Sequence, residues 1–254
     1  MMNPVRVRNV EIGTGVPKIC VPIVGRTQAE IEDGARSISA VGADVVEWRV
    51  DWYDQCGQFS EVESTLQRLR EILGETPILF TFRTAGEGGE KAIDAERYVE
   101  LNQNAVKSGY IDLVDAELFI GDTYVEAIIG AARECGVKVI VSNHDFNKTP
   151  SKEEIIKRLV KMQSMGADLP KIAVMPQSRK DVLTLLAATE EMSGEHADRP
   201  IITMSMAQTG VISRLCGEIF GSALTFGAAG KASAPGQIGV EALRTVLELL
   251  HEGL

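Results

Sequence analysis

The feature that most constrains the fold of this chain is a regular alternation of short apolar runs with longer amphipathic stretches. The apolar runs have the length and composition of buried strands and cover residues 19–24, 44–50, 78–83, 111–117, 137–143, 171–175, 201–206 and 223–227. Between most of them, apolar residues recur at helical spacing, over residues 27–41, 61–73, 92–108, 123–135, 152–165 and 179–192, and again over 240–251. Strands that alternate with helices form parallel sheets with crossover helices. Eight such units in 254 residues predict a (β/α)8 barrel.

The ends of the helical stretches carry the expected signals. Thr27 is followed by Glu30, and Ser151 by Glu154, both at the spacing of a capping box. A doubly wound open sheet is the alternative architecture. No low-complexity stretch or linker interrupts the chain, so we expect residues 1–254 to form a single domain. Residues 5–7 and 10–12 alternate around Arg8 and Asn9, which predicts a small β-hairpin that caps the bottom of the barrel.

Composition excludes several classes of partner. The formal net charge is −10, whereas a surface that binds duplex nucleic acid is usually basic. No stretch approaches the roughly 18 apolar residues of a membrane span. Residues 1–15 contain no apolar segment of the kind found in signal peptides.

The four cysteines, Cys20, Cys56, Cys135 and Cys216, have no metal-binding spacing. Cys20 and Cys135 lie in or beside apolar segments, so we expect packed, reduced thiols and a cytoplasmic protein.

Lys171 stands alone in an apolar run between Pro170 and Pro176. Lysine is rarely buried without a partner, and burial disfavours the charged form of an amine. A neutral amine is a nucleophile that forms Schiff bases with carbonyl groups. The alternative is a lysine whose side chain extends from a strand end to water.

Polar residues gather at the ends of the predicted strands, where active sites of (β/α)8 barrels lie. Glu47 and Arg49 are two residues apart and therefore share a face of their strand, as do Thr81 and Arg83. A structural ion pair inside the barrel is an equally good explanation for Glu47 and Arg49. Asp115 and Glu117 end the fourth strand; two carboxylates suit acid–base or metal chemistry, but the chain has only three histidines, so we expect no metal.

His144 ends the fifth strand and is the candidate general base, because imidazole titrates near neutral pH. Its alternative role is to cap neighbouring backbone. His196 and His251 are expected at the surface. Glu87 lies in a glycine-rich loop after Arg83 that lacks the GxGxxG pattern of dinucleotide sites. This loop is as compatible with a surface turn as with a site.

The segment after the eighth strand contains Gly230-Lys231 but fails the phosphate-loop pattern GxxxxGK[ST] at Thr225 and Ala232. We interpret it as a mobile lid, from which Ser233 and Gln237 donate hydrogen bonds to a ligand. Arg214 follows the seventh strand, and an arginine there is suited to hold a carboxylate. A surface ion pair is the other possibility for Arg214.

Together these segments make the chain resemble the type I 3-dehydroquinate dehydratases of the shikimate pathway. The resemblance covers nearly the whole chain and rests on the order of several short motifs: Glu47-Trp48-Arg49-Val50-Asp51, Phe82-Arg83-Thr84, Ser142-Asn143-His144-Asp145-Phe146, Pro170-Lys171-Ile172-Ala173, Ser205-Met206-Ala207-Gln208-Thr209-Gly210, Ser213-Arg214 and Ser233-Ala234-Pro235-Gly236-Gln237. It implies a (β/α)8 barrel, a homodimer, and catalysis with neither metal nor organic cofactor.

The resemblance also implies a role for each site residue. Lys171 forms an imine with the C3 ketone of 3-dehydroquinate. His144 removes the C2 proton and then protonates the departing C1 hydroxyl, and Glu87 orients His144. The substrate-binding residues are Arg214 for the carboxylate, Ser233 and Gln237 from the lid, and Glu47, Arg49 and Arg83 for the hydroxyls. Pro22 departs from relatives that carry serine in strand one, so one hydroxyl contact is expected to be missing.

Two other functions remain open from the residues alone. A class I aldolase shares the imine chemistry, but such an enzyme usually recognises phosphate, and the chain lacks a convincing phosphate loop after strands seven and eight. A non-catalytic barrel that binds a small acid is the second alternative, although it has no need for a lysine in an apolar strand. The chemistry is the same in aromatic amino acid biosynthesis and in quinate breakdown, and so does not distinguish them.

Overall fold

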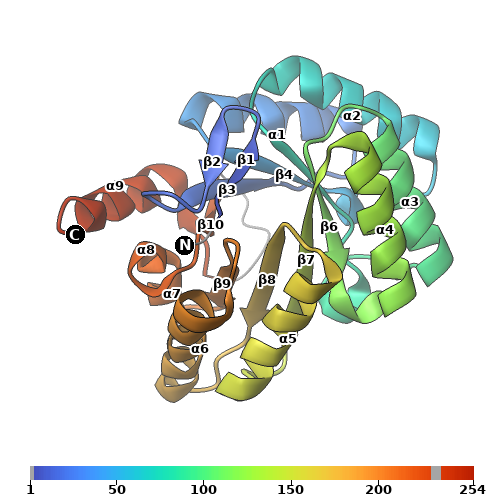
Figure 1. Cartoon of the computed structure of the whole chain (residues 1–254). Coiled ribbons are helices and arrows are strands. Elements are labelled where there is room, and N and C mark those ends of the chain that lie inside the picture. Colours follow the sequence, from blue (N-terminus) through green and yellow to red (C-terminus); the bar gives the residue numbers. More distant parts are fainter. Residues whose placement is uncertain (1–2, 230–235) are drawn as a thin grey trace.

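Eight parallel strands curl into a barrel that is surrounded by helices (Figure 1). The computed structural model describes residues 3–229 and 236–254. Within them the barrel strands are β3 (Lys18–Ile23), β4 (Val45–Arg49), β5 (Ile78–Thr81), β6 (Leu113–Glu117), β7 (Lys138–Asp145), β8 (Leu169–Val174), β9 (Ile202–Ser205) and β10 (Leu224–Ala228). Each of β3 to β8 pairs with the next strand, and β10 returns to pair with β3. The predicted (β/α)8 barrel is confirmed, and the open doubly wound sheet is wrong.

The outer helices follow the predicted amphipathic stretches. They are α1 (Gln28–Val41), α2 (Phe59–Leu73), α3 (Ala95–Lys107), α4 (Asp122–Cys135), α5 (Lys152–Met165), α6 (Arg179–Glu191) and α9 (Val240–His251). The Thr27 and Ser151 side chains accept hydrogen bonds from the backbone N–H of Glu30 and Glu154, which is the N-cap half of each predicted capping box. After β9 the chain instead forms two short helices, α7 (Ile212–Leu215) and α8 (Gly217–Phe220). Further short helical turns are η1 (Val50–Trp52), η2 (Ala85–Glu87), η3 (Leu118–Ile120) and η4 (Met192–His196), and β11 (Ile238–Gly239) extends the sheet beside β10.

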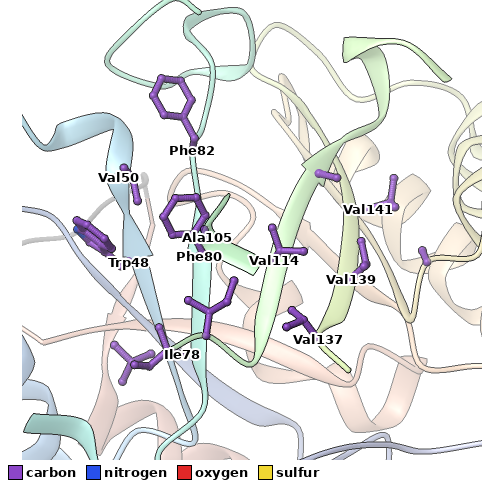
Figure 2. Close-up of a cluster of buried hydrophobic side chains, with 14 of the residues drawn as sticks. Trp48, Val50, Ile78, Phe80, Phe82, Ala105, Val114, Val137, Val139 and Val141 are labelled. Carbon is purple, nitrogen blue, oxygen red and sulfur yellow. The ribbon is translucent and has the colours of Figure 1, made fainter. Parts of the chain in front are cut away.

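The outward-facing side chains of the strands form one hydrophobic core with the helices. Figure 2 shows part of it, where Trp48, Phe80, Val114 and Val141 project from neighbouring strands. The rings of Trp48 and Phe80 meet edge to face, with centroids 5.9 Å apart, an arrangement that aromatic pairs favour.

The inward-facing side chains change character along the strands. The layer nearest the amino ends of the strands is apolar and buried; it comprises Cys20, Val45, Leu79, Leu113, Ile140, Leu169, Ile202 and Leu224. Two residues further along, the same face carries buried polar groups, namely Glu47, Thr81, Asp115, Ser142 and Lys171. Because side chains alternate across a strand, the sequence places an apolar floor beneath a polar layer at the carboxyl end.

The predicted hairpin closes the floor from below. β1 (Val5–Val7) pairs antiparallel with β2 (Val10–Ile12). The side chains of Val5, Val7 and Ile12 are buried against the apolar floor. At the turn, Arg8 forms ion pairs with Glu75 and Asp112. The hairpin therefore caps the bottom of the barrel, as predicted.

The barrel closes between β9 and β10 with the help of serine side chains. An isolated parallel bridge joins Ile201 to Ser222. The backbone N–H of Thr203 donates to Ser222 Oγ over 2.9 Å, and that of Ser205 donates to Ser213 Oγ over 2.9 Å. We call this junction the seam. Hydroxyl groups there accept hydrogen bonds from buried strand amides in place of backbone carbonyls.

The cysteines and histidines with a predicted burial lie where expected, with one exception. Cys20 is buried, but Cys135 is exposed at the end of α4, so the expectation that it packs is wrong. His196 and His251 are exposed, as expected. None of the helices that the structure describes combines the length and apolar character needed to cross a membrane. Most of the predicted lid, including Ser233, lies outside the described residues.

Candidate active site

A pocket opens at the carboxyl ends of the strands. Its lining includes eight of the nine predicted site residues: Glu47, Arg49, Arg83, Glu87, His144, Lys171, Arg214 and Gln237. The ninth, Ser233, lies outside the described residues. Further lining comes from residues that the sequence did not single out, namely Gly88, Phe146, Ala173, Met204, Met206 and Phe226.

Lys171 projects from the middle of β8 into this pocket. The residue is only 2% exposed, so the alternative of a side chain that extends to water is wrong. Its Nζ lies 3.4 Å from Asp115 Oδ2 and 4.5 Å from the centre of the Phe226 ring. One face of the amine is thus held by a carboxylate and another by an aromatic ring, which attracts cations.

Asp115 links Lys171 to a buried network. Its Oδ1 accepts a hydrogen bond from Ser142 Oγ at 2.7 Å and pairs with Arg83 Nη2 at 2.9 Å. Burial alone would raise the pKa of Asp115, but the cations of Arg83 and Lys171 outweigh burial and hold this pKa below its usual value. Asp115 is therefore an anion between two cations.

Arg83 is the centre of this network. Its Nη1 donates to Glu117 Oε1 over 2.8 Å and to Ser142 Oγ over 3.1 Å. Glu117 also accepts the backbone N–H and hydroxyl of Thr84. The two carboxylates that end the fourth barrel strand thus pair with Arg83. In the part of the chain that the structure describes, no group of three His, Cys, Asp or Glu side chains is arranged to hold a metal ion.

His144 and Glu87 form a second functional pair. The Glu87 Oε2 atom lies 3.0 Å from His144 Nδ1 and accepts the backbone N–H of His144 over 2.8 Å. A carboxylate at Nδ1 favours the tautomer with the proton on Nδ1, which leaves Nε2 as an acceptor. Burial lowers the pKa of His144 well below its usual value, and the nearby cations of Arg83 and Lys171 lower it further. The imidazole is therefore neutral at neutral pH.

The loop after β5 places Glu87 beside His144. η2 turns the chain back, and Gly88 continues it with φ +83°, in the left-handed region. A Cβ on Gly89 would lie 1.9 Å from the Arg83 carbonyl oxygen, so only glycine allows this close approach. Glu87 is only 7% exposed, whereas Ala85, Gly86 and Gly88 are exposed, so the loop lies at the surface and turns this one side chain inward. Burial raises the pKa of Glu87 to about 7.

At the end of β4, polar groups are arranged around Asp51, a residue that the sequence analysis did not select. Arg49 donates from Nε and Nη2 to the two oxygens of Asp51 over 2.8 and 2.7 Å. Asp51 also accepts the backbone N–H of Glu90, which fixes the glycine-rich loop to this strand. Glu47 Oε1 accepts a hydrogen bond from Thr81 Oγ1 over 2.9 Å. The spacing Arg49-Val50-Asp51 was the only sequence signal for this pair.

Arg214 enters the pocket from α7. It is 1% exposed, and its Nη1 lies 3.7 Å from Met204 Sδ. Burial lowers its pKa to about 10, so the guanidinium remains charged at neutral pH. The alternative of a surface ion pair is wrong. A buried cation in a pocket wall is suited to bind an anionic group.

The fold and this pocket define a (β/α)8-barrel enzyme with a buried lysine, a neutral histidine and buried arginines at the carboxyl ends of its strands. The family model of type I 3-dehydroquinase matches residues 19–253. A curated relative from Listeria welshimeri, a 3-dehydroquinate dehydratase, is 59% identical over 251 residues, which are 99% of each chain. The chain therefore belongs to the type I 3-dehydroquinase family, and its activity is that of a 3-dehydroquinate dehydratase.

Solved structures agree with this assignment. The type I 3-dehydroquinate dehydratase from Clostridium difficile, solved with covalent modified comenic acid, has a TM-score of 0.98 and 54% identity, with all of both chains covered. The 3-dehydroquinate dehydratase from Enterococcus faecalis has a TM-score of 0.91 and 48% identity over 97% of this chain and 99% of that one.

Proposed function

We propose that the chain converts 3-dehydroquinate to 3-dehydroshikimate by a syn elimination of water through an imine on Lys171. The observation that carries this proposal is that Lys171 and His144 line one pocket from the neighbouring strands β8 and β7. An amine and a neutral imidazole in a largely buried pocket supply a nucleophile and a base. The covalent modified comenic acid of the Clostridium difficile relative is compatible with a nucleophile in such a pocket.

The reaction divides into steps that these two residues perform. The Lys171 ammonium first gives up one proton, and its free Nζ lone pair attacks the C3 carbonyl carbon. That proton is returned to the C3 hydroxyl of the adduct, which leaves as water and gives a protonated imine. His144 Nε2 then takes the C2 proton. The electron pair of the C–H bond forms the C2–C3 double bond, and the π pair of the C–N double bond moves to nitrogen, which gives an enamine. The enamine electrons expel the C1 hydroxyl, which takes the proton from His144 and leaves as water. Addition of one water to the new imine releases the product and the amine.

Glu87 has the role of orienting His144. Its carboxylate holds the proton on Nδ1, so that Nε2 faces the reacting carbon. The charge on Glu87 also stabilises the imidazolium that forms after proton removal, as a buried carboxylate does in other histidine-dependent enzymes.

The remaining pocket residues bind the substrate. Arg214 holds the carboxylate, with Gln237 and Ser233 completing this end of the site. Glu47, Arg49 and Arg83 bind the hydroxyl groups. Since Asp51 occupies Nε and Nη2 of Arg49, we assign the Nη1 of that residue to the substrate. Pro22 in β3 provides no hydroxyl.

We further propose that the enzyme is a cytoplasmic homodimer that needs neither a metal ion nor an organic cofactor. It would act in the shikimate pathway of aromatic amino acid biosynthesis. Growth of a dehydratase-deficient bacterium without aromatic amino acids tests the pathway, and failure to support growth contradicts it. Sedimentation velocity tests the dimer, which a single species of monomer mass would exclude.

Borohydride trapping tests the imine directly. Reduction in the presence of 3-dehydroquinate should fix an adduct to Lys171, detected by peptide mass spectrometry, while Lys171→Met should form no adduct and lose all turnover. His144→Ala is the matched control, because it removes the base and keeps the amine; it should form the adduct and lose most turnover, by about 10²- to 10⁴-fold. Turnover by Lys171→Met, or an adduct on another residue, would refute the proposal.

A further inference from the structure

Two polar residues outside the pocket belong to a chain of hydrogen bonds that ends at His144. Arg158 Nη1 on α5 donates to Asn143 Oδ1 over 2.9 Å. Asn143 Nδ2 in turn donates to Glu87 Oε1 over 3.1 Å. The other oxygen of Glu87 is the one that contacts His144 Nδ1 at 3.0 Å. We propose that Asn143 and Arg158 are positioning residues, which act on the proposed base His144 by keeping Glu87 ionised and correctly oriented.

The position of Asn143 in β7 is unusual for an amide. The outward-facing residues before it on this strand are Val139 and Val141, which pack in the outer core (Figure 2). Asn143 continues this face, and the residue is 3% exposed. A buried amide costs free energy unless it is hydrogen-bonded. The Oδ1 of Asn143 accepts from Arg158, and its Nδ2 donates to Glu87. These two contacts explain why an amide can be buried at this position.

Arg158 determines which way the amide faces. A guanidinium group has only donors, so the atom of Asn143 that it contacts must be the oxygen. The amide nitrogen is then directed at Glu87 Oε1. Arg158 is itself held by Glu154, at 2.8 Å, and by the ring of Phe119, whose centre lies 5.3 Å from the guanidinium carbon. These contacts fix the first member of the chain.

Several charged groups face Glu87 from the surrounding elements. Arg83, after β5, has its Nη1 3.6 Å from Glu87 Oε2 and favours the carboxylate. Glu117, at the end of β6, disfavours it, as does burial. The amide of Asn143 and the backbone N–H of His144 favour the carboxylate, and they lower the pKa of Glu87 from the value that burial alone would give.

The other charged groups act on the imidazole or on Asn143. Lys171 on β8 and Arg49 on β4 act on His144, where they disfavour the imidazolium, and Arg158 lies beyond Asn143 on α5. Asn143 is an uncharged side chain that favours the carboxylate form of Glu87. Its removal should therefore raise the pKa of Glu87 and increase the protonated fraction at a given pH. A protonated Glu87 no longer selects the required tautomer of His144.

The test is the pH dependence of kcat/KM, which reports the ionisation of the free enzyme. In Asn143→Ala, the acidic half-maximum should move up by about 1 to 2 pH units, because a hydrogen bond to a charged group is lost. Asn143→Asp keeps the shape and the contact with Arg158 but removes the donor, and should shift the profile in the same direction. Asn147→Ala is the matched control, because Asn147 is an exposed asparagine two residues after the end of β7. This variant should leave the pH profile unchanged.

Arg158 is tested in the same assay. Arg158→Met should move the half-maximum upward by less than Asn143→Ala, since the amide remains but is free to turn. Arg158→Lys, which still donates to the Asn143 oxygen, should recover part of the shift. Lys161→Met removes an exposed cation from the same helix and should have no effect.

Borohydride trapping on Lys171 separates this inference from the proposed function on which it rests. Adduct formation by both asparagine variants, with a shifted pH profile, supports the positioning role. A uniform fall of kcat/KM at every pH, with no shift in either Asn143 variant, would overturn it and indicate a purely structural role. Absence of the Lys171 adduct in the unaltered enzyme would instead contradict the proposed mechanism.

Discussion

At the scale of single residues, the pair Glu87 and His144 makes activity depend on pH in a defined direction. Burial raises the pKa of Glu87 to about 7 and lowers that of His144 well below its usual value. As pH falls through the Glu87 pKa, the carboxylate gains a proton while His144 is still neutral. We therefore expect kcat/KM to fall by about tenfold per pH unit on the acidic side of this value, measured as initial rates of enone absorbance.

Glu87→Gln provides the comparison for that profile. The amide oxygen can still accept from His144 Nδ1 but does not titrate, so the acidic fall should disappear. The rate at high pH should be lower by roughly tenfold, because a hydrogen bond to a neutral acceptor is weaker than one to an anion. If the variant keeps the same acidic fall, another group controls it.

The sequence identified most pocket residues through their place at strand ends. Lys171, His144 and Glu47 could be predicted because a polar residue in an apolar strand is conspicuous. Asp51 was not selected, and Asp115 was noted only as a strand-end carboxylate, since each pairing joins residues on different segments or depends on a side-chain rotamer. Asn143 was missed because its role depends on Arg158, which is 15 residues away in the sequence.

At the scale of elements, the seam between β9 and β10 depends on two serines. Ser213→Ala would leave the buried backbone N–H of Ser205 without the acceptor it has in the native structure. We expect the free energy of unfolding to fall by about 1–3 kcal/mol, the usual cost of an unsatisfied buried donor. Chemical denaturation followed by circular dichroism measures this.

Ser164→Ala is the control for the seam. Ser164 is exposed on α5, and its hydroxyl donates only to the backbone of its own helix. Its removal should change stability little. Equal stability of the two variants would mean that water replaces the Ser213 hydroxyl.

Elements with strong periodicity were predicted, and those without it were not. The long helices and the eight barrel strands follow from repeats of apolar residues over ten or more positions or from compact apolar runs. α7 and α8 have four residues each, too few for a helical repeat to show. η2 could not be predicted because its shape depends on contacts of Glu87 with Asn143 and His144 on β7, far away in the sequence.

At the scale of the whole molecule, stability and activity belong to opposite ends of the barrel. Ile12 of the hairpin is fully buried against the apolar floor, whereas the pocket opens at the other end. Ile12→Ala should lower the free energy of unfolding by about 2–5 kcal/mol and leave kcat and KM unchanged. Glu11→Ala, on the exposed side of the same strand, should change neither. A large change in KM in Ile12→Ala would show that the two ends are coupled.

The closed floor also affects how reactant and product enter and leave the pocket. Because the hairpin and the apolar layer close the amino end of the part of the barrel that the structure describes, we expect reactant and product to pass through the same open end. A product molecule that has not departed excludes the next reactant, so the product acts as a competitive inhibitor of its own formation. Accumulated product thus slows the enzyme, and a downstream reaction that consumes it also restores access to the pocket.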